Sequence, residues 1–289
     1  MKLLITGANG FIGSYFINKY QNKYNIKKFS FLKDDISTLD FNGVDVVLHL
    51  SALVHQMAGA SFEEYEKVNV TQTMNLANKA KESGVKQFIF MSTVKVYGEE
   101  SDKKYTENSK CNPEDAYGIS KLKAECELLK LETENFQISI VRTPIVYGYG
   151  VKANIKNLIN LVSKMSILPF GGIENKRSMV YIGNLCHLID LLIKKSISGV
   201  FLISDDETIS TSCLLNKISL VLNKKIFLVK IPYFDNFLKL IQPKIYKKLY
   251  KSLEIDWQET KKKLDVKNPY SITEGLNEMF NNPNGKIKY

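Results

Sequence analysis

The sequence lacks a hydrophobic run long enough to cross a membrane. Only four apolar or β-branched residues separate Lys2 from Gly7, whereas a transmembrane helix needs roughly 18 or more apolar residues in succession. We therefore expect no transmembrane segment and a cytoplasmic location.

Cysteine is scarce as well. The four cysteines, at positions 111, 126, 186 and 213, are far apart and form neither a CxxC pair nor a metal-ligand spacing. Disulfide frameworks and zinc sites both need closer or more regular spacings. The sequence therefore predicts free thiols in a reducing compartment and no metal site.

Acidic residues are outnumbered by basic ones. The chain of 289 residues has 40 Lys and Arg against 30 Asp and Glu, a formal net charge of +10. Such a charge attracts nucleotides, nucleic acids and anionic membrane surfaces. The lysines are spread along helix-like segments, however, and no zinc-finger spacing, RNA-recognition signature or heptad repeat accompanies them. We expect solvated helix faces and no nucleic-acid partner.

The start of the chain contains a strand, a glycine-rich turn and a helix in direct succession. Residues 2–6 are typical of a short buried strand, Gly7, Gly10 and Gly13 follow, and a helical stretch extends to Tyr20. In this pattern the first glycine permits a tight turn, the second lets a pyrophosphate approach, and the third packs the helix on the strand. The free N–H groups at the helix start hold the anion. The arrangement predicts dinucleotide binding, with a plain tight turn as the alternative.

The expected second strand, residues 26–32, ends without the acidic residue that selects NAD. In NAD sites an Asp or Glu about 20 positions after the glycines bonds the ribose 2′-hydroxyl. Asp34 and Asp35 come only after the strand, and the short interval before the next strand leaves little room for the additional strand usually found there. Lysines nearby make a 2′-phosphate, and therefore NADP, admissible; they are Lys27, Lys28 and Lys33.

Strands and helices alternate as far as residue 143. Strand-like runs at 44–50, 85–91 and 137–142 are separated by helical stretches at 62–83 and from 113 to 132. This alternation, with continuously apolar strands, predicts an α/β fold with a doubly wound parallel sheet. Ser92 and Thr93 follow one of these strands, at the edge where such sheets bind their ligands.

Beyond Pro144 the pattern changes to a smaller, mixed α/β arrangement. We predict a dinucleotide-binding domain over residues 1–150 and a substrate domain over residues 151–289 that packs directly on it. The stretch 234–251 would form a basic amphipathic helix interrupted by Pro243, which either covers the substrate domain or makes a peripheral membrane contact. Helical stretches are expected at 154–166, 185–195, 211–222, 234–253 and 257–264, with strand-like pieces at 177–182 and 200–203.

Tyr117 and Lys121 are four positions apart and therefore share one face of a helix. An ammonium beside a phenol favours the phenolate, so the pKa of the phenol falls toward the range of a general base. The hydroxyl of Thr93 would complete a catalytic set with Tyr117 and Lys121. On its own, a Tyr-x-x-x-Lys pattern also recurs by chance on solvated helix faces.

Six short motifs are spread over the first half of the chain. They are TGANGFIG at 6–13, HLSA at 49–52, VNVTQT at 68–73, MSTVKVYG at 91–98, YGISK at 117–121 and VRTPIVYG at 141–148. In order and spacing they resemble the extended short-chain dehydrogenase/reductase family, in its NAD-dependent epimerase/dehydratase branch. The resemblance implies a Rossmann-type sheet, NAD or NADP as cofactor and a UDP-sugar as substrate. It also implies a homodimer through the helices at 62–83 and 117–132.

The same resemblance assigns site residues. It implies that Thr93 hydrogen-bonds the reacting sugar oxygen, that Tyr117 transfers the proton, and that Lys121 binds the nicotinamide ribose. Arg177 resembles the arginine that binds the substrate pyrophosphate, and Asn154 resembles an asparagine that contacts the nucleotide-sugar. The implied cofactor contacts are Gly7, Asn9, Gly10, Phe11, Ile12, Gly13, Asp35, Ile36, Leu50, Ser51, Ala52, Asn69, Met91, Ser92, Tyr117, Lys121 and Pro144.

A narrower likeness concerns the reaction. The segments GVKANIKNLINLV, LPFGGIENKRSMVYIGNL and SLEIDWQET resemble bacterial enzymes of surface-polysaccharide assembly, which are 4-epimerases and 4-ketoreductases of N-acetylhexosamines on UDP or, for some epimerases, on polyprenyl diphosphate. Because the adenosine end is short and lacks its acid, we expect exchangeable dinucleotide, which favours a 4-ketoreductase of a UDP-linked (6-deoxy-)N-acetylhexosamine. A 4-epimerase and a non-catalytic dinucleotide-binding protein are the alternatives. Ile145 stands where many sugar epimerases place a substrate-binding Asn.

Overall fold

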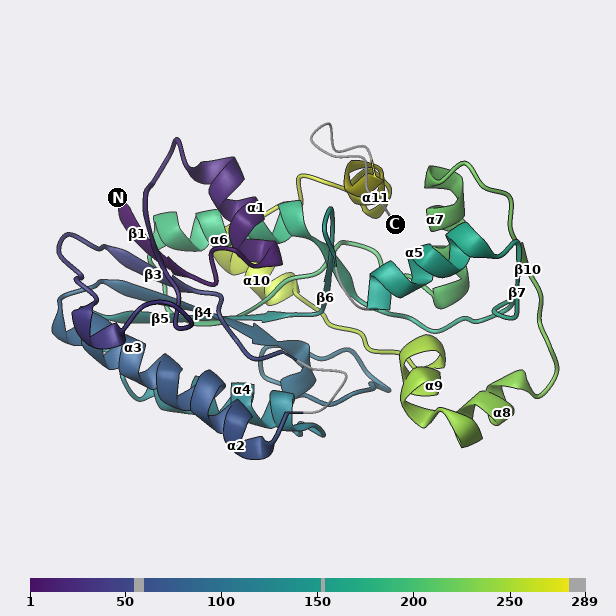
Figure 1. The fold of residues 1–289 in the computed structure, drawn as a ribbon, viewed down its shortest axis with the longest axis horizontal. Helices are drawn as coiled ribbons and strands as arrows, with labels where there is room; N and C mark the ends of the chain where they lie inside the picture. Colours follow the sequence, from purple (N-terminus) through teal and green to yellow (C-terminus); the bar gives the residue numbers. More distant parts are fainter. Residues whose placement is uncertain (55–59, 152–153, 281–289) are drawn as a thin grey trace.

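A six-stranded parallel sheet forms the larger part of the molecule, and helices cover both of its faces (Figure 1). The computed structural model describes residues 1–54, 60–151 and 154–280. The predicted α/β fold with a Rossmann-type doubly wound parallel sheet is confirmed. Across the sheet the strands are β2 (Asn25–Phe29), β1 (Lys2–Thr6), β3 (Val46–His49), β4 (Gln87–Thr93), β5 (Gln137–Thr143) and β9 (Gly199–Leu202).

Alternate residues of the central strands point into two separate cores. On β4, Ile89 and Met91 join the core under α1 and α6, whereas Phe88 and Phe90 join the core under α3 and α4. A strand buried on both faces has no polar side, which is why residues 88–91 of β4 form a continuous apolar run in the sequence. These helices are α1 (Phe11–Tyr20), α3 (Gln72–Glu82), α4 (Ala116–Leu129) and α6 (Ile182–Lys195).

The strand order reverses at β1. β2 pairs with one edge of β1 and β3 pairs with the other, so the loops that follow β1 and β3 are neighbours at the carboxyl edge of the sheet. Open α/β sheets bind their ligands in the crevice at such a reversal. The fold therefore places the glycine turn and the HLSA segment at one crevice.

The edge strand β2 is shorter than predicted. It ends at Phe29, and the Asp34 carboxylate then accepts a hydrogen bond from the Ser30 N–H at 2.8 Å, which closes a turn. A short 3-10 helix, η1 (Ile36–Thr38), follows. Within the described part of the chain no strand lies beyond β2, in keeping with the short interval in the sequence.

The helix predicted over residues 62–83 is present from Phe62 to Glu82, but its middle is π-helical. It begins as α2 (Phe62–Tyr65) with a capping box between Ser61 and Glu64, passes through a π-helical segment η2 (Glu66–Thr71), and continues as α3. π-helical turns are rare and frequently lie at functional sites. Here η2 contains Asn69, one of the predicted cofactor contacts.

The smaller part of the molecule is built from the chain after Pro144 and lies at the right of Figure 1. Its division from the first part at residue 150 stays a prediction, and β9 and α6, from the second stretch, belong to the layers of the large sheet. Helix α11 (Ile272–Phe280) is not among the predicted elements.

The other elements of the whole chain are η3 (Val94–Val96), β6 (Ile145–Tyr147), α5 (Asn154–Lys164), β7 (Ile167–Leu168), β8 (Met179–Tyr181), α7 (Thr211–Val221), β10 (Phe227–Leu228) and α10 (Gln258–Leu264).

The helical stretch predicted at 234–253 is interrupted by Pro243, as expected, and forms two helices, α8 (Phe234–Ile241) and α9 (Pro243–Tyr250), which we call the α8–α9 pair. They meet at Gln242, because Pro243 has no N–H to donate and its ring disfavours helical geometry in the residue before it. The pair lies in the smaller part of the molecule, at the lower right of Figure 1. Over the described ranges, no helix is both long enough and apolar enough to cross a membrane.

Candidate active site

The glycine turn after β1 has the geometry that its spacing predicts. Gly7 has a φ of +66°, and a Cβ there would come within 2.8 Å of the Ser51 nitrogen. A Cβ on Gly13 would lie 2.3 Å from the Gly7 carbonyl oxygen, so only glycine lets α1 pack on the turn. The start of α1 has no side-chain cap among the described residues. Its first N–H groups therefore fit a dinucleotide pyrophosphate.

The loop after β3 is fixed beside this turn. Ser51 donates its N–H at 3.2 Å and its hydroxyl at 3.1 Å to Thr6 Oγ1, which also shares a hydrogen bond of 2.7 Å with His49 Nδ1. Burial lowers the pKa of His49 to about 3, so its ring is neutral and acts as a structural link. The predicted cofactor contacts Leu50, Ser51 and Ala52 are thereby held at the crevice.

The adenosine side of the crevice is the loop after β2. The Asp35 carboxylate accepts a hydrogen bond from the Ser37 N–H at 2.9 Å, and hydrogen bonds from Ser37 lower the pKa of this carboxyl. The Ile36 carbonyl accepts from Lys79 Nζ at 2.7 Å. The two predicted contacts, Asp35 and Ile36, therefore lie in one short loop, and Ser37 of this loop and Lys79 of α3 satisfy part of their hydrogen bonding.

The other predicted cofactor contacts lie on the same edge of the sheet. Asn9 is in the glycine turn, and Phe11 and Ile12 begin α1. Met91 is in the last part of β4, and Pro144 directly follows β5.

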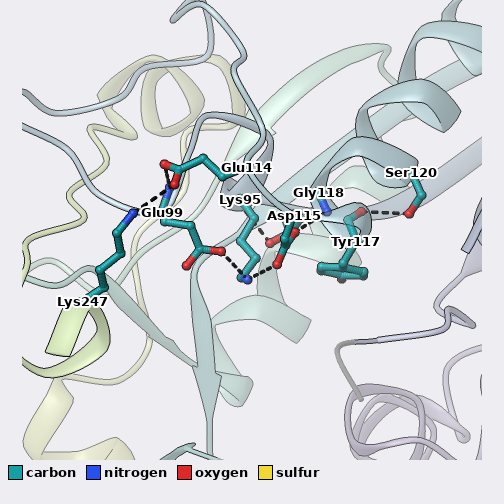
Figure 2. Close-up of polar contacts among 9 residues, drawn as sticks. Lys95, Glu99, Glu114, Asp115, Tyr117, Gly118, Ser120 and Lys247 are labelled. Carbon is teal, nitrogen blue, oxygen red and sulfur yellow. Dashed lines mark hydrogen bonds and ion pairs between the residues drawn. The ribbon is translucent and has the colours of Figure 1, made fainter. Parts of the chain in front are cut away.

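A charged cluster joins the elements that contain Thr93 and Tyr117 (Figure 2). Thr93 ends β4, is 8% exposed, and accepts a hydrogen bond from the Lys95 N–H at 3.3 Å. The Lys95 ammonium lies between the carboxylates of Glu99 and Asp115. Asp115 is the N-cap of α4 and accepts a backbone N–H of the first turn at 2.7 Å. These contacts bring the start of the Tyr117 helix to the end of β4.

The phenol of Tyr117 is in a poorly solvated environment at the start of α4. Burial raises the pKa of Tyr117 above its ordinary value, and the Asp115 carboxylate and the Tyr65 phenol raise it further. The lowering of this pKa that we predicted from Lys121 is therefore wrong for the protein alone. The physical reason is that burial dominates and that the charged group acting on the phenol is the Asp115 carboxylate. Additional positive charge is needed before this phenol can act as a base.

Lys121 is buried one turn further along α4 and is 2% exposed. Its Nζ lies over the Phe90 ring, 3.9 Å from the centroid. Desolvation lowers the pKa of Lys121 to about 7, with the Glu125 carboxylate acting in the opposite direction. The side chain therefore changes its charge near neutral pH.

Asn69 connects the loop after β3 to the Tyr117 helix. Its Oδ1 accepts from the Leu53 N–H at 2.8 Å, and its Nδ2 donates at 3.0 Å both to the Leu53 carbonyl and to Ser120 Oγ. The Ser120 hydroxyl in turn donates to the Tyr117 carbonyl at 2.8 Å (Figure 2). The side chain predicted as a cofactor contact thus positions two of the segments that form the crevice.

Ser92 contacts a buried ion pair. Its hydroxyl donates to Glu125, whose carboxylate also accepts from Arg142 Nε at 3.1 Å and Nη2 at 2.6 Å. Arg142 Nη1 donates to the Tyr97 hydroxyl at 2.7 Å. The sequence analysis did not identify this cluster. The signal was an arginine at the end of an apolar strand, because a buried charge needs a partner. The cluster stabilises the carboxyl ends of β4 and β5 below Thr93.

Arg177 lines a cavity of about 450 Å³ in the smaller part of the molecule. Its Nη1 donates to the Lys251 carbonyl at 3.0 Å, and burial lowers the pKa of the guanidinium, with Glu99 opposing. Lys248 of α9, which sequence reasoning missed, brings a second cation to the cavity. The apolar walls are formed by Ile145, Ile155, Leu158, Leu161, Phe170, Met179, Ile209, Leu214, Ile245 and Leu249.

A second, charged cavity of about 230 Å³ lies between α9 and the start of α4. Lys95, Asp115 and Lys248 are among its walls, so it shares Lys248 with the Arg177 cavity. The structure thus brings Arg177 into the same region as the Tyr117 helix. Asn154 begins α5, but its side chain lies outside the described part of the structure, and its substrate contact stays a prediction.

Known proteins resemble this chain over almost its whole length. A model of the NAD dependent epimerase/dehydratase family matches residues 3–203. A UDP-glucose 4-epimerase of Vibrio cholerae is 36% identical over 96% of this chain and 93% of its own length. An N-acetyl-alpha-D-glucosaminyl-diphospho-ditrans,octacis-undecaprenol 4-epimerase of Escherichia coli O157:H7 is 29% identical over 80% of this chain and 75% of its own.

A solved structure shows the same fold. The UDP-N-acetylglucosamine 4-epimerase from Bacillus cereus superimposes over 99% of this chain and 100% of its own with a TM-score of 0.79, at 20% identity. The predicted family, enzyme class and nicotinamide cofactor are confirmed, since the chain belongs to the NAD dependent epimerase/dehydratase family.

Proposed function

We propose that the protein catalyses 4-epimerisation of a hexose carried on a diphosphate, with an N-acetylhexosamine as the sugar. The observation that supports this most is a complete set of Thr93, Tyr117 and Lys121 at the sheet edge, near a cavity with Arg177 and Lys248. The near full-length similarity to the Vibrio cholerae UDP-glucose 4-epimerase favours epimerisation over reduction.

The crevice between the loops after β1 and β3 is the proposed dinucleotide site. Gly7 and Gly13 leave no room for a Cβ, and the start of α1 supplies free N–H groups to a pyrophosphate. A bound nicotinamide would supply hydride transfer at C4 of the sugar. Asn69 and Ser120 hold the cofactor loop against the Tyr117 helix, and therefore set the distance between the two reactants.

Tyr117 is the proposed proton-transfer group. Its phenolate would accept the proton of the C4 hydroxyl, and the phenol would return it once the 4-keto sugar has turned its other face. The Thr93 hydroxyl would donate a hydrogen bond to the same oxygen. Because burial and Asp115 raise the pKa of Tyr117, Lys121 must be charged when the phenolate forms.

Arg177 and Lys248 are the proposed diphosphate ligands. A guanidinium binds phosphate oxygens with directed, charge-assisted hydrogen bonds. The apolar walls of the cavity would accept either a nucleoside or the first isoprene units of a lipid carrier. The carrier is therefore UDP or polyprenyl diphosphate.

A 4-ketoreductase of a UDP-linked (6-deoxy-)N-acetylhexosamine is the second candidate. The observation that favours it is the edge strand β2, which ends at Phe29 with no acid at the position that binds the ribose. A site without this charge-assisted bond loses roughly 1.5 to 3 kcal/mol of dinucleotide binding. Weak, exchangeable binding suits an enzyme that releases its cofactor after each turnover.

The two candidates are separated by two incubations of purified protein. The first contains UDP-N-acetylglucosamine without added cofactor, and formation of UDP-N-acetylgalactosamine, followed by NMR, is expected. The second contains a UDP-4-keto-6-deoxy-N-acetylhexosamine with NADH or NADPH. Oxidation of the reduced dinucleotide there, with no conversion in the first, would replace epimerisation by reduction. Inactivity in both, and with lipid-linked sugar, would contradict the proposed function.

A further inference from the structure

The chain between β10 and α9 exposes an unusual number of large apolar side chains. Neither α8 nor α9 has a buried residue. Phe237 is 58% exposed and Leu240 is 84% exposed. The exposed apolar side chains of this segment, which we call the apolar face, are Phe227, Val229, Ile231, Tyr233, Phe237, Leu240, Ile241 and Ile245.

The exposed apolar residues of α8 form one stripe. Phe237, Leu240 and Ile241 follow the spacing i, i+3 and i+4, which places them on one side of the helix. In a surface helix such a stripe normally faces the protein core. Here it faces outward, at the end of the molecule opposite the large sheet (Figure 1). Contiguous exposed apolar surface of this kind marks a binding surface.

Positive charge surrounds the apolar face. Residues 227–251 contain six lysines and a single acid, Asp235. Lys247 pairs with Glu114 at 3.0 Å and Lys251 pairs with Glu100 at 3.3 Å, so these two hold α9 to the body of the protein. The exposed lysines Lys230, Lys239 and Lys244 have no ion pair within the described ranges.

We propose that the α8–α9 pair docks this protein on an anionic lipid membrane. An apolar stripe with flanking lysines is the pattern of helices that lie in the membrane interface, where burial of apolar area and attraction to anionic headgroups add together. Each lysine near such a surface contributes attraction that neutral lipids do not offer. The charge of the surface therefore selects an anionic bilayer over an uncharged apolar partner.

Docking would place the Arg177 cavity next to the bilayer. Ile245 belongs to the apolar face and also lines this cavity, and Lys248 and Leu249 follow on the same helix. A diphosphate on a lipid carrier could then reach the cavity without leaving the membrane surface. This consequence rests on the proposed function, whereas the docking itself does not.

A second copy of the chain is the main competing occupant. The homodimer predicted from the sequence would use the helices at 62–83 and 117–132, which lie against the large sheet and leave the apolar face uncovered (Figure 1). A symmetric contact through the apolar face would also bring Lys239 and Lys244 of both copies together, and like charges at close range oppose association.

The test is co-sedimentation of the full-length protein with lipid vesicles. One set contains phosphatidylcholine alone and the other contains phosphatidylcholine with phosphatidylglycerol. The variants are Phe237→Glu/Leu240→Glu, which places two carboxylates on the apolar face, and Leu32→Glu, which changes another exposed leucine (96% exposed) far from it. Because none of these side chains is buried, all variants should keep the wild-type melting temperature.

We expect the wild type to sediment with phosphatidylglycerol vesicles, to stay in solution with phosphatidylcholine alone, and to be released by high salt. The double variant should lose at least about tenfold in partitioning, and Leu32→Glu should behave as the wild type. Wild-type protein that stays soluble with anionic vesicles would overturn the proposal, as would a double variant that still sediments. Light scattering that shows a dimer abolished by the double variant, without vesicle binding, would assign the face to a second copy instead.

Turnover of UDP-linked sugar in solution separates this inference from the proposed function. The variant Phe237→Glu/Leu240→Glu should keep the wild-type turnover of UDP-linked sugar. An active enzyme that fails to bind vesicles would leave the proposed function standing and remove only the membrane surface.

Discussion

The ammonium of Lys121 lies 3.9 Å from the centroid of the Phe90 ring, between β4 and α4. A ring face attracts a desolvated cation by roughly 2 kcal/mol, which is less than the cost of removing its hydration. Burial consequently lowers the pKa of Lys121 from 10.5 to about 7. The residue that the proposed mechanism requires to be charged is thus held where charge is costly.

We predict that the cost of burying the Lys121 charge appears as a pH-dependent stability difference between the wild type and Lys121→Met. Between pH about 7 and 10.5 the unfolded chain binds a proton at Lys121 that the folded protein does not bind, so the free energy of unfolding rises with pH. The variant should be the more stable protein at pH 7, by up to roughly 4 kcal/mol, and its advantage should shrink as the pH rises.

Urea unfolding of cofactor-free protein at several pH values measures this difference. Lys130→Met is the matched control, because Lys130 is at the end of the same helix with a side chain 68% exposed. A stability gap for Lys121→Met that does not change with pH would contradict the assignment of the titration to this lysine.

Tyr117→Phe should abolish most turnover and leave dinucleotide affinity almost unchanged. The substitution deletes the proton-transfer hydroxyl and little contact area, and general acid–base catalysis contributes roughly 10² to 10⁴ in rate. Steady-state rates and dinucleotide titration of the same preparation give both quantities. Tyr20→Phe, which removes a phenol hydroxyl from α1 on the other face of the sheet, should retain activity. More than about a tenth of the wild-type rate in Tyr117→Phe would exclude the proposed role.

The buried pair of Glu125 and Arg142 should be coupled strongly in stability. Glu125→Leu leaves the Arg142 guanidinium, which is 6% exposed, without its carboxylate, and loss of one partner of a buried pair costs roughly 3 to 5 kcal/mol. The double variant Glu125→Leu/Arg142→Met removes both charges and should be less destabilised than Glu125→Leu alone. Additive effects of the two single substitutions in urea unfolding would mean that the pair contributes no coupling energy.

Much of the fold could be predicted because its physical causes are local in sequence. Strands buried on both faces must be largely apolar, as residues 46–48 of β3 and 88–91 of β4 are. The glycine turn could be predicted for the same kind of reason, since Gly7 and Gly13 occupy positions where a Cβ would meet backbone atoms. Pro243 likewise marked the break between α8 and α9.

The remaining features depend on contacts between residues far apart in sequence. The π-helical segment around Asn69 has no composition that distinguishes it from a regular helix, and its amide is used by Leu53 and Ser120. The raised pKa of Tyr117 follows from burial and from Asp115 at the helix start, whereas spacing alone showed only Lys121. The tertiary environment determines pKa values and local helix geometry of this kind, and the periodicity of the sequence carries no information about that environment.

The guanidinium of Arg177 has two possible roles, and a binding measurement can separate them. It lines the proposed diphosphate cavity, and it also donates to the Lys251 carbonyl at the end of α9 at 3.0 Å. Arg177→Ala should weaken UDP binding by roughly tenfold or more, which corresponds to a charge-assisted hydrogen bond of about 1.5 to 3 kcal/mol. Isothermal titration of UDP into the wild type and the variant measures the change.

Asn175→Ala is the control that separates the two roles. Asn175 Nδ2 donates to the same Lys251 carbonyl at 3.1 Å but has no charge to offer a phosphate. Its loss should loosen α9 and leave the dissociation constant for UDP nearly unchanged. Equal weakening by Asn175→Ala and Arg177→Ala would show that Arg177 acts by holding α9 in place, and an unchanged constant in Arg177→Ala would remove it from the diphosphate site. Only selective weakening by Arg177→Ala fits a guanidinium that contacts the phosphates directly.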